Sequence, residues 1–350
     1  MAKENKRLKV GITCGDINGI GSELIFKTFS DPRMIEMCLP VVYGSVKAIT
    51  FSKKLLNYKD FHFHVPQNSG DLNKKKLNII NVEEKEVPVE FGKSTLEAGK
   101  LAFKALEAAV EDLASTKIDV LVTAPINKEN IQKAGFEFPG HTEFLASYAN
   151  EENPLMILMR DQLRVGLVTG HIPLKEVSNQ LTKELILTKL EKLNASLIKD
   201  FRCTKPKIAL LGLNPHAGEE GVLGEEENTI IKPAVETANS NGIYAFGPYP
   251  ADGFFGSGAY RNFDGVLAMY HDQGLTPFKA LSFGGGVNFT AGLPIVRTSP
   301  DHGTAYDIAG KNQADPGSFR EAVYAAIDIA RNRKMHMEAS ADPLEKQKKP

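Results

Sequence analysis

The segment LKVGITCGDINGIGSE (residues 8–23) joins a short apolar run to the start of a helix through a glycine-rich turn. The run Leu8–Thr13 has the composition of a strand that is buried on both faces. Similar runs alternate with helical patterns along the chain, at Leu39–Tyr43, Leu77–Val82, Asp119–Thr123, Arg164–Thr169, Lys207–Leu213 and Gly265–Tyr270. Alternation of strands and helices predicts an α/β fold with a largely parallel sheet.

Two of the helical patterns are long and amphipathic. In Ser94–Ser115 and in Thr182–Phe201 the apolar residues fall on one stripe of the helix. No linker marks a domain boundary, which favours domains between which the chain crosses more than once. The segment after about Arg333 is polar and rich in lysine, and we expect it to be frayed.

The composition argues against several classes of function. The 350 residues, 42% of them hydrophobic, suffice for one large or two medium domains with normal cores. Because 42 basic residues balance 43 acidic ones, the net charge of −1 predicts no binding to nucleic acid or to an anionic membrane. The three cysteines are far apart, and neither a signal-peptide core nor a membrane-length apolar run is found. We therefore expect a cytoplasmic protein without disulfides.

Three histidines stand at the ends of apolar runs: His171 in TGHIP, His216 in NPHAG and His271 in YHDQG. Strand ends of an α/β sheet are where ligands bind, so these three imidazoles can converge on one point. Three nitrogen ligands suit Zn²⁺ or Co²⁺ and leave a coordination position open for a substrate. Asp272 is a candidate further ligand or a group that orients a histidine. From spacing alone, strand-end histidines satisfied by backbone hydrogen bonds are an equal alternative.

A first candidate anion site is the start of the helix in FPGHTEFLA. His141 and Thr142 lie where the free backbone amides of a helix attract an anion. An ordinary capped helix is the alternative.

A second candidate anion site surrounds Gly284–Gly286, whose backbone permits the close approach of another group. Lys279, Asn288 and Arg297 flank these glycines, and two cations with an amide can hold a phosphate or a carboxylate. The alternative is that the charged groups are solvated on the surface. The turn Gly15–Glu23 lacks both nucleotide fingerprints, and a plain tight turn explains it equally well.

Over nearly its whole length, from about residue 9 to residue 331, the chain resembles the 4-hydroxythreonine-4-phosphate dehydrogenase family. The likeness rests on motifs in one order: GDINGIGSE, TAPINKENIQKAG, FPGHTEFLA, VTGHIPLKEV, LNPHAGEEGVLGEEE, GPYPADGFF, YHDQGLTPFK, GGGVNFTAGLPIVRTSPDHGTAYDIAGK and ADPGSF. The stretch DHGTAYDIAGKNQADPGSF is also similar to the nucleotide-binding stretch of isocitrate and isopropylmalate dehydrogenases.

The resemblance implies two α/β/α domains of the isocitrate/isopropylmalate dehydrogenase-like type, mostly parallel, with the active site in the interdomain cleft. An NAD-binding domain would contain residues 1–140 plus 280–335. A metal-binding and dimerisation domain would contain residues 141–279, and a polar tail residues 336–350.

Roles for single residues also follow from the resemblance. One divalent metal (zinc, cobalt or magnesium) is implied at His171, His216 and His271, shared between the subunits of a homodimer. If the ligands are shared, inactive variants of His171 and His271 are expected to complement each other. The implied substrate contacts are His141, Thr142, Lys279, Asn288 and Arg297. NAD, or NADP, is implied near Gly284, Gly285, His302 and Asp307.

The implied reaction is the NAD-dependent oxidation of 4-phosphooxy-L-threonine to 2-amino-3-oxo-4-phosphooxybutanoate, which decarboxylates to 3-amino-2-oxopropyl phosphate in pyridoxal 5'-phosphate biosynthesis. Lys279 is our choice of proton acceptor, and Asp252 and Asp272 are rivals. A sister dehydrogenase of threonate 4-phosphate, a metal-dependent phosphohydrolase and a non-catalytic binding protein are the alternatives. Ile17, Asn18 and Ser22 depart from the proline- and alanine-containing first turn of the family, so we expect this turn to be more mobile.

Overall fold

The structure is a computed structural model that describes residues 7–67 and 70–341. The chain forms two compact units. Unit 1 comprises Met1–Arg160 and Lys279–Ile327, and unit 2 comprises Asp161–Phe278 and Asp328–Pro350.

A mostly parallel sheet forms the centre of unit 1, with the strand order β3-β4-β2-β1-β5-β12-β11-β6. In this strand order β11 runs antiparallel to its neighbours β12 and β6, and the pairs from β3 to β12 are parallel. The strands are β1 (Lys9–Thr13), β2 (Leu39–Gly44), β3 (Phe63–His64), β4 (Leu77–Asn81), β5 (Val120–Thr123), β6 (Leu155–Arg160), β11 (Val287–Ala291) and β12 (Arg297–Pro300).

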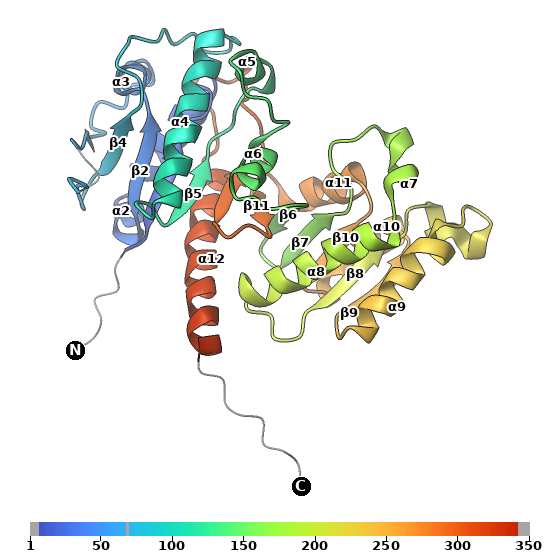
Figure 1. The fold of residues 1–350 in the computed structure, drawn as a ribbon. Coiled ribbons are helices and arrows are strands. Elements are labelled where there is room, and N and C mark those ends of the chain that lie inside the picture. The colour runs from blue at the N-terminus through green and yellow to red at the C-terminus, as the bar shows by residue number, and fades with distance from the viewer. Residues whose placement is uncertain (1–6, 68–69, 342–350) are drawn as a thin grey trace. The chain divides into compact units, whose positions relative to one another are not determined.

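The helices of unit 1 cover this sheet because each has one apolar stripe. The longest, α4 (Leu96–Ala114), buries Leu101, Leu106 and Val110 against β1, β2 and β5 (Figure 1). Thr95 caps its start by accepting a hydrogen bond from the Ala98 amide. The other helices are α1 (Gly21–Phe29), α2 (Pro32–Met37), α3 (Val46–Leu55), α5 (Lys128–Lys133) and α6 (His141–Tyr148).

Unit 2 has a parallel sheet in the order β7-β10-β8-β9. Its strands are β7 (Leu163–Leu167), β8 (Lys207–Leu211), β9 (Tyr244–Tyr249) and β10 (Gly265–Ala268). The helices α8 (Lys183–Lys199) and α9 (Lys232–Ser240) pack on these strands (Figure 1). Shorter helices are α7 (Val177–Gln180), α10 (Ala251–Gly256), the 3₁₀ segments η1 (Leu174–Glu176), η2 (Pro215–Gly221) and η4 (Ala259–Asn262), and the π-helix η3 (Glu227–Ile231).

The chain passes from one unit to the other at three points, of which the first lies between β6 and β7 and the other two lie within helices. Residues of α11 (His271–Ser282) belong to unit 2 up to Phe278, and residues of α12 (Gly317–Ala341) belong to unit 1 up to Ile327. Unit 1 also contains residues 141–160, whereas the sequence placed a boundary near residue 140. The reason is that β6 pairs with β11 from Leu155 to Met159.

The α/β fold with a mostly parallel sheet is confirmed. Each of the seven strands and both long helices expected from the sequence is present, with ends that shift by two residues at most. The sequence did not reveal five strands, β3, β6, β9, β11 and β12, and the last two lie in the segment interpreted as a glycine-rich anion loop. Their short sequences VNFTA and RTSP are buried by pairing with distant strands, which no local pattern reports.

The expectation of a frayed segment after Arg333 is wrong as far as residue 341. Helix α12 continues to Ala341, and Arg333 forms a buried ion pair with Asp200 at 2.6 Å. The polar end of α12 is stable because the Arg333–Asp200 ion pair joins it to the end of α8. The remainder of the predicted tail, residues 342–350, lies outside the described residues.

Candidate functional site

Two of the predicted metal ligands lie side by side in unit 2. His171 follows β7 and His271 begins α11, and their ring centroids are 5.4 Å apart with planes tilted by 43°. The amide and the hydroxyl of Thr169 both donate to the carbonyl oxygen of Met269, at 3.2 and 2.7 Å. These bonds join the turn after β7 to the turn after β10, which brings the two rings together.

The pair fits two ligands of one metal ion. Imidazole nitrogens ~2.1 Å from a tetrahedral ion place the ring centroids about 5 Å apart, close to the 5.4 Å observed. His271 Nδ1 donates to Asp272 Oδ1 at 2.7 Å, which leaves Nε2 with its lone pair for a metal. Asp272 therefore has the geometry of a residue that orients a ligand.

His216 lies in a left-handed turn at the end of β8. Residues 216–220 all have positive φ angles, between 43° and 80°, and the His216 side chain is exposed. This conformation costs L-residues roughly 1–2 kcal/mol each, and such strain clusters at functional sites. Within residues 7–67 and 70–341, no set of three His, Cys, Asp or Glu side chains is placed to hold a metal ion. The structure thus pairs His171 with His271 and leaves His216 apart from them.

The predicted anion site at the start of α6 is in unit 1. Gly140 precedes the helix in an extended conformation and provides no side-chain cap, so the first amides remain available to a ligand. His141 is half-buried, but its Nε2 atom is shut off from solvent and has no hydrogen-bond partner in the described part of the chain. Burial, and then the positive charges of Arg297 and Lys128, hold the pKa of His141 well below 6.5. The ring is therefore neutral at physiological pH.

Helix α6 is joined to the strands that carry the other anion-binding candidates. Thr142 Oγ1 lies 3.4 Å from Thr290 Oγ1 on β11. On the same strand, the Asn288 side chain donates to Met156 Sδ at 3.4 Å, while its buried Oδ1 has no partner among the described residues. A buried, unpaired carbonyl oxygen is costly unless a ligand satisfies it.

Arg297 on β12 is the buried cation of this region, with only 3% of its surface exposed. Its Nε and Nη2 atoms donate to Thr123 Oγ1 at 3.1 and 2.6 Å. Burial lowers the pKa of Arg297 to about 10, although the charge of Glu143 opposes this shift. The guanidinium therefore remains a cation at neutral pH in a place that favours an anionic partner.

Lys279 and the two rival proton acceptors are exposed. Lys279 lies on α11, and in the described ranges no polar contact joins its ammonium group to His141, Thr142, Asn288 or Arg297. Asp252 lies on α10 in unit 2. Of the substrate candidates, the structure thus brings together the α6, β11 and β12 residues, but not Lys279.

The GDINGIGSE turn packs directly on the DHGTAYDIAGK segment, although 280 residues of sequence separate them. The Ile20 amide donates to the Thr304 carbonyl oxygen at 3.1 Å. A Cβ atom at Gly19 would lie 2.8 Å from the same oxygen, so the contact requires glycine. The turn is therefore more than a local bend, because it supports the stretch expected to bind a nucleotide.

A buried polar cluster under this contact was missed by the sequence analysis. Asp16, 1% exposed, accepts hydrogen bonds from the Tyr306 hydroxyl and from Asn130 Nδ2, both at 2.7 Å. Burial and the neighbouring carboxylate raise the pKa of Tyr306, which keeps the phenol protonated. Asn130 Oδ1 is buried without a partner in the described residues. Because the three residues are far apart in the chain, no local motif could reveal them.

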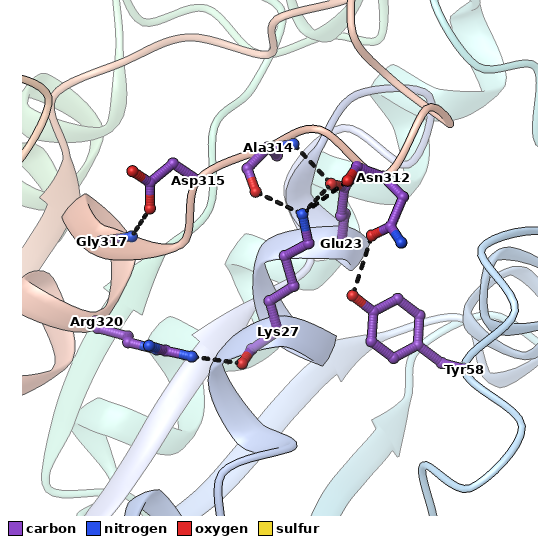
Figure 2. A network of polar contacts seen from close by, with 8 residues as sticks. All are labelled: Glu23, Lys27, Tyr58, Asn312, Ala314, Asp315, Gly317 and Arg320. Carbon is purple, nitrogen blue, oxygen red and sulfur yellow. Dashed lines mark hydrogen bonds and ion pairs between the residues drawn. The ribbon is translucent and has the colours of Figure 1, made fainter.

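Helix α1 holds the end of the same stretch. Figure 2 shows Lys27 donating to the carbonyl oxygens of Asn312 and Ala314, at 3.0 and 2.7 Å. Glu23 Oε1 accepts from the Ala314 amide at 2.7 Å and forms an ion pair with Lys27 at 2.9 Å. The Tyr58 hydroxyl donates to Asn312 Oδ1 at 3.1 Å. These contacts fix the path of the chain between DHGTAYDIAGK and α12.

Hydrogen bonds of Asn18 hold the first turn, for which the sequence predicts greater mobility. Asn18 is fully buried, and its Nδ2 donates to the Lys93 carbonyl oxygen and to Thr95 Oγ1, at 2.9 and 3.0 Å. Its Oδ1 accepts from the Glu90 amide at 2.7 Å. Asn18 therefore holds the turn by tertiary hydrogen bonds in place of the stiffness of proline.

The four residues predicted to contact the nucleotide differ in burial and in the groups that lie near them. The group that approaches Gly285 is the guanidinium of Arg160, whose Nη1 donates to the Gly285 carbonyl oxygen at 3.0 Å. Gly284 (φ +76°) faces open space. The Nε2 atom of His302 is buried without a partner among the residues described, and Asp307 is exposed. Gly284 thus has room for a ligand, and His302 Nε2 lacks a hydrogen-bond partner that a ligand could supply.

Comparison with known proteins identifies the family of the chain. Residues 36–326 match the family model described as "Pyridoxal phosphate biosynthetic protein PdxA". A 4-hydroxythreonine-4-phosphate dehydrogenase of Bacteroides thetaiotaomicron is 52% identical over 345 residues, which are 98% of this chain and 94% of that protein.

Two further relatives extend the comparison. The crystal structure of the Klebsiella pneumoniae 4-hydroxythreonine-4-phosphate dehydrogenase is similar with a TM-score of 0.81 at 34% identity, covering 92% of this chain and 99% of that one. A protein of Oceanobacillus iheyensis named as a candidate D-threonate 4-phosphate dehydrogenase is 39% identical over 331 residues, covering 93% of this chain and 99% of that protein. In the described ranges, no helix is long and apolar enough to cross a bilayer.

Proposed function

Since the chain belongs to the PdxA family of pyridoxal phosphate biosynthetic proteins, we propose that it is the dehydrogenase that oxidises 4-phosphooxy-L-threonine. The product, 2-amino-3-oxo-4-phosphooxybutanoate, then loses CO₂ to give 3-amino-2-oxopropyl phosphate. The observation that supports this proposal most directly is the pairing of His171 with His271, with a ring separation suited to one metal ion.

A divalent ion at this pair would lower the pKa of the substrate C3 hydroxyl and so ease its deprotonation. NAD, or NADP, would accept the hydride from C3. The donor set of imidazoles favours zinc or cobalt, and magnesium fits if substrate oxygens complete its shell. Asp272 holds the His271 ring in the tautomer that a metal requires.

The chain's own residues would bind the two anionic ends of the substrate. Arg297 offers a buried positive charge, and the first turn of α6 offers free amides beside Thr142. Neutral His141 and Asn288 each present a buried atom without a partner in the described chain, so a hydrogen bond to substrate would satisfy both. These interactions orient C3 and exclude water from it.

We propose that the nucleotide binds along the DHGTAYDIAGK segment. The proposal is supported by contacts that hold this segment and the residues after it in place. They come from Gly19 and Asp16 of the first turn and from Lys27 of α1. His302, with a buried and unpaired Nε2, is the residue of this segment best placed to accept a ligand.

The metal ligands would come from two copies of the chain. His171 and His271 lie together in one chain, so the third ligand in this proposal is His216 of the partner subunit. Its exposure on a strained turn supports presentation to another molecule rather than to its own chain. This arrangement makes the homodimer necessary for a complete site.

The proton acceptor is Lys279 in this proposal. Asp272 is committed to His271 by a hydrogen bond of 2.7 Å, which makes it the weaker candidate. Asp252 is exposed on α10 and remains a rival.

A spectrophotometric assay tests the proposed substrate. We expect reduction of NAD, followed at the absorbance of NADH, with 4-phosphooxy-L-threonine and metal present. D-threonate 4-phosphate is the second substrate to compare, because a 39% identical relative is named for it. A higher kcat/KM for D-threonate 4-phosphate would replace the proposed substrate, and no turnover of either compound would refute the dehydrogenase proposal.

A further inference from the structure

The loop that carries His216 is folded around a buried carboxylate. Glu227, 1% exposed, accepts hydrogen bonds at Oε1 from the amides of Leu213 and Asn214, at 2.7 and 2.8 Å. Its Oε2 accepts from Asn214 Nδ2 at 3.0 Å. Both oxygens are thus bonded to the two residues that lead into the Pro215–Gly221 turn. No ion pair of Glu227 is found in the part of the chain that the structure describes.

Two glycines of the loop are shaped by the same carboxylate. A Cβ atom at Gly218 would lie 2.6 Å from Glu227 Oε2, and one at Gly212 would lie 3.1 Å from Oε1. Gly218 also has a φ of +80° in the middle of the left-handed turn. The loop therefore encloses Glu227, whose carboxylate occupies the space beside the two glycines.

The start of the loop is also tied to the turn that carries His271. Gln273 Nε2 donates to the carbonyl oxygen of Gly212, and Gln273 Oε1 accepts from the Met269 amide at 2.7 Å. One side chain thus joins the end of β8 to the beginning of α11. The His216 loop consequently has a defined position with respect to the His171–His271 pair within unit 2.

From these contacts we propose that Glu227 is a positioning residue that pre-organises the left-handed turn of His216 for metal binding. The proposal rests on the proposed function, since it assumes that His216 is a ligand. Four of the five residues from 216 to 220 are not glycine, so the turn is unfavourable on its own. In this proposal His216 binds the metal ion of the partner subunit, so contacts with His171 and His271 of its own chain do not stabilise its conformation. Its conformation must therefore be held from inside its own unit, which is what Glu227 does.

The test replaces Glu227 by glutamine, which has the same size but turns one acceptor into a donor that faces Asn214 Nδ2. Cobalt(II) is titrated into the metal-free full-length protein, and the visible absorption of the bound ion reports affinity and ligand geometry. We expect E227Q to bind cobalt ~10–100-fold more weakly than the unchanged protein, as is usual for groups that orient a metal ligand. Glu236→Gln is the matched control, because Glu236 is exposed on α9 in the same unit, and this variant should bind cobalt normally.

A second readout follows the loop without any metal. In the metal-free protein, amide hydrogen exchange at residues 213–220 should be faster in E227Q than in E236Q, while exchange in α8 stays the same. If E227Q does not fold, Asn214→Ala removes the hydrogen bond to Glu227 Oε2 together with the one to Glu226 Oε2, but keeps both amide bonds to Glu227 Oε1. It should show a smaller loss of cobalt affinity. Equal cobalt affinity and equal exchange in E227Q and the unchanged protein would overturn the role of Glu227. If the unchanged protein gives no cobalt spectrum, the metal site itself is wrong, and this inference falls with it.

Discussion

At the scale of single residues, burial distinguishes polar atoms that need a ligand as a hydrogen-bond partner from those that water can satisfy. His141, Asn288 and His302 each contain a buried atom without a partner in the described residues, whereas Lys279 and Asp252 are exposed. A buried polar atom that is not bonded lowers the stability of the free protein. The three orphaned atoms therefore mark places where a substrate or nucleotide would supply the missing hydrogen bond.

His141 should make the stability of the protein depend on pH. Its folded-state pKa lies well below the ordinary 6.5, so below pH 6.5 the unfolded chain binds a proton that the folded chain does not. The free energy of unfolding therefore decreases as the pH falls. For this one group, the decrease approaches about 1.4 kcal/mol per pH unit. Urea unfolding of the protein and of His141→Gln at pH 7 and pH 5.5 measures this contribution. The variant should lose less stability between the two pH values, and equal losses would contradict the shift.

At the scale of elements, polar residues near the ends of helices fix segments that are distant in the sequence. Helix α1 does this for the segment before α12 through Glu23 and Lys27, and α8 does it for the end of α12 through Asp200. Both devices join residues more than 100 positions apart. Neither is visible as a local motif.

Lys27→Met should weaken nucleotide binding in particular. The variant loses the hydrogen bonds to Asn312 and Ala314 and leaves Glu23 without its ion-pair partner. We expect the KM for NAD to rise roughly 5–10-fold, the equivalent of about one hydrogen bond, with a smaller change in the KM for the phosphorylated substrate. Steady-state kinetics with each substrate varied in turn measure this difference. Lys54→Met on α3, an exposed lysine, is the control, and equal changes in both KM values would point to a general loss of structure.

Arg333→Met should destabilise the protein strongly. Arg333 and Asp200 are 7% and 2% exposed and 2.6 Å apart, so the substitution leaves a buried carboxylate without its cation. Such a loss costs about 3–5 kcal/mol. The matched control is Arg331→Met, because Arg331 pairs with Asp328 at 3.9 Å on the surface and contributes less than ~1 kcal/mol. Chemical denaturation of both variants measures the difference, and equal effects would show that burial of the Arg333 pair is unimportant.

At the scale of the whole molecule, the candidate residues are divided between the units. The substrate and nucleotide candidates belong to unit 1, and the three histidines belong to unit 2. The proposed metal site also requires His216 of the partner subunit. Activity should therefore be lost on dilution below the dissociation constant of the dimer.

Mixing inactive variants tests the sharing of the metal site. Because His171 and His271 are adjacent in one chain, variants of these two residues should not complement each other, contrary to the expectation from sequence. His216→Ala mixed with His171→Ala should instead restore one complete site in each mixed dimer. With free exchange of subunits, activity should reach roughly one quarter of the normal value. Activity in the first mixture, or none in the second despite mixed dimers seen by native mass spectrometry, would contradict the proposed division of ligands.

The sequence by itself determined the α/β fold and the identity of the candidate ligands. Apolar runs such as Leu39–Tyr43 and the stripe of Ser94–Ser115 are local patterns, and local patterns are sufficient to specify strands and helices. The motifs around His171, His216 and His271 likewise carry the family resemblance without reference to any contact.

Only the tertiary structure decided which of these residues meet. It paired His171 with His271, separated His216 on a left-handed turn, and placed Asp16 and Glu227 under loops that the sequence could not connect to them. The physical reason is that a buried polar group must find its partner in space, whatever the distance along the chain. For the same reason the polar strand β12 and the last turns of α12 were missed, since partners from distant segments stabilise both.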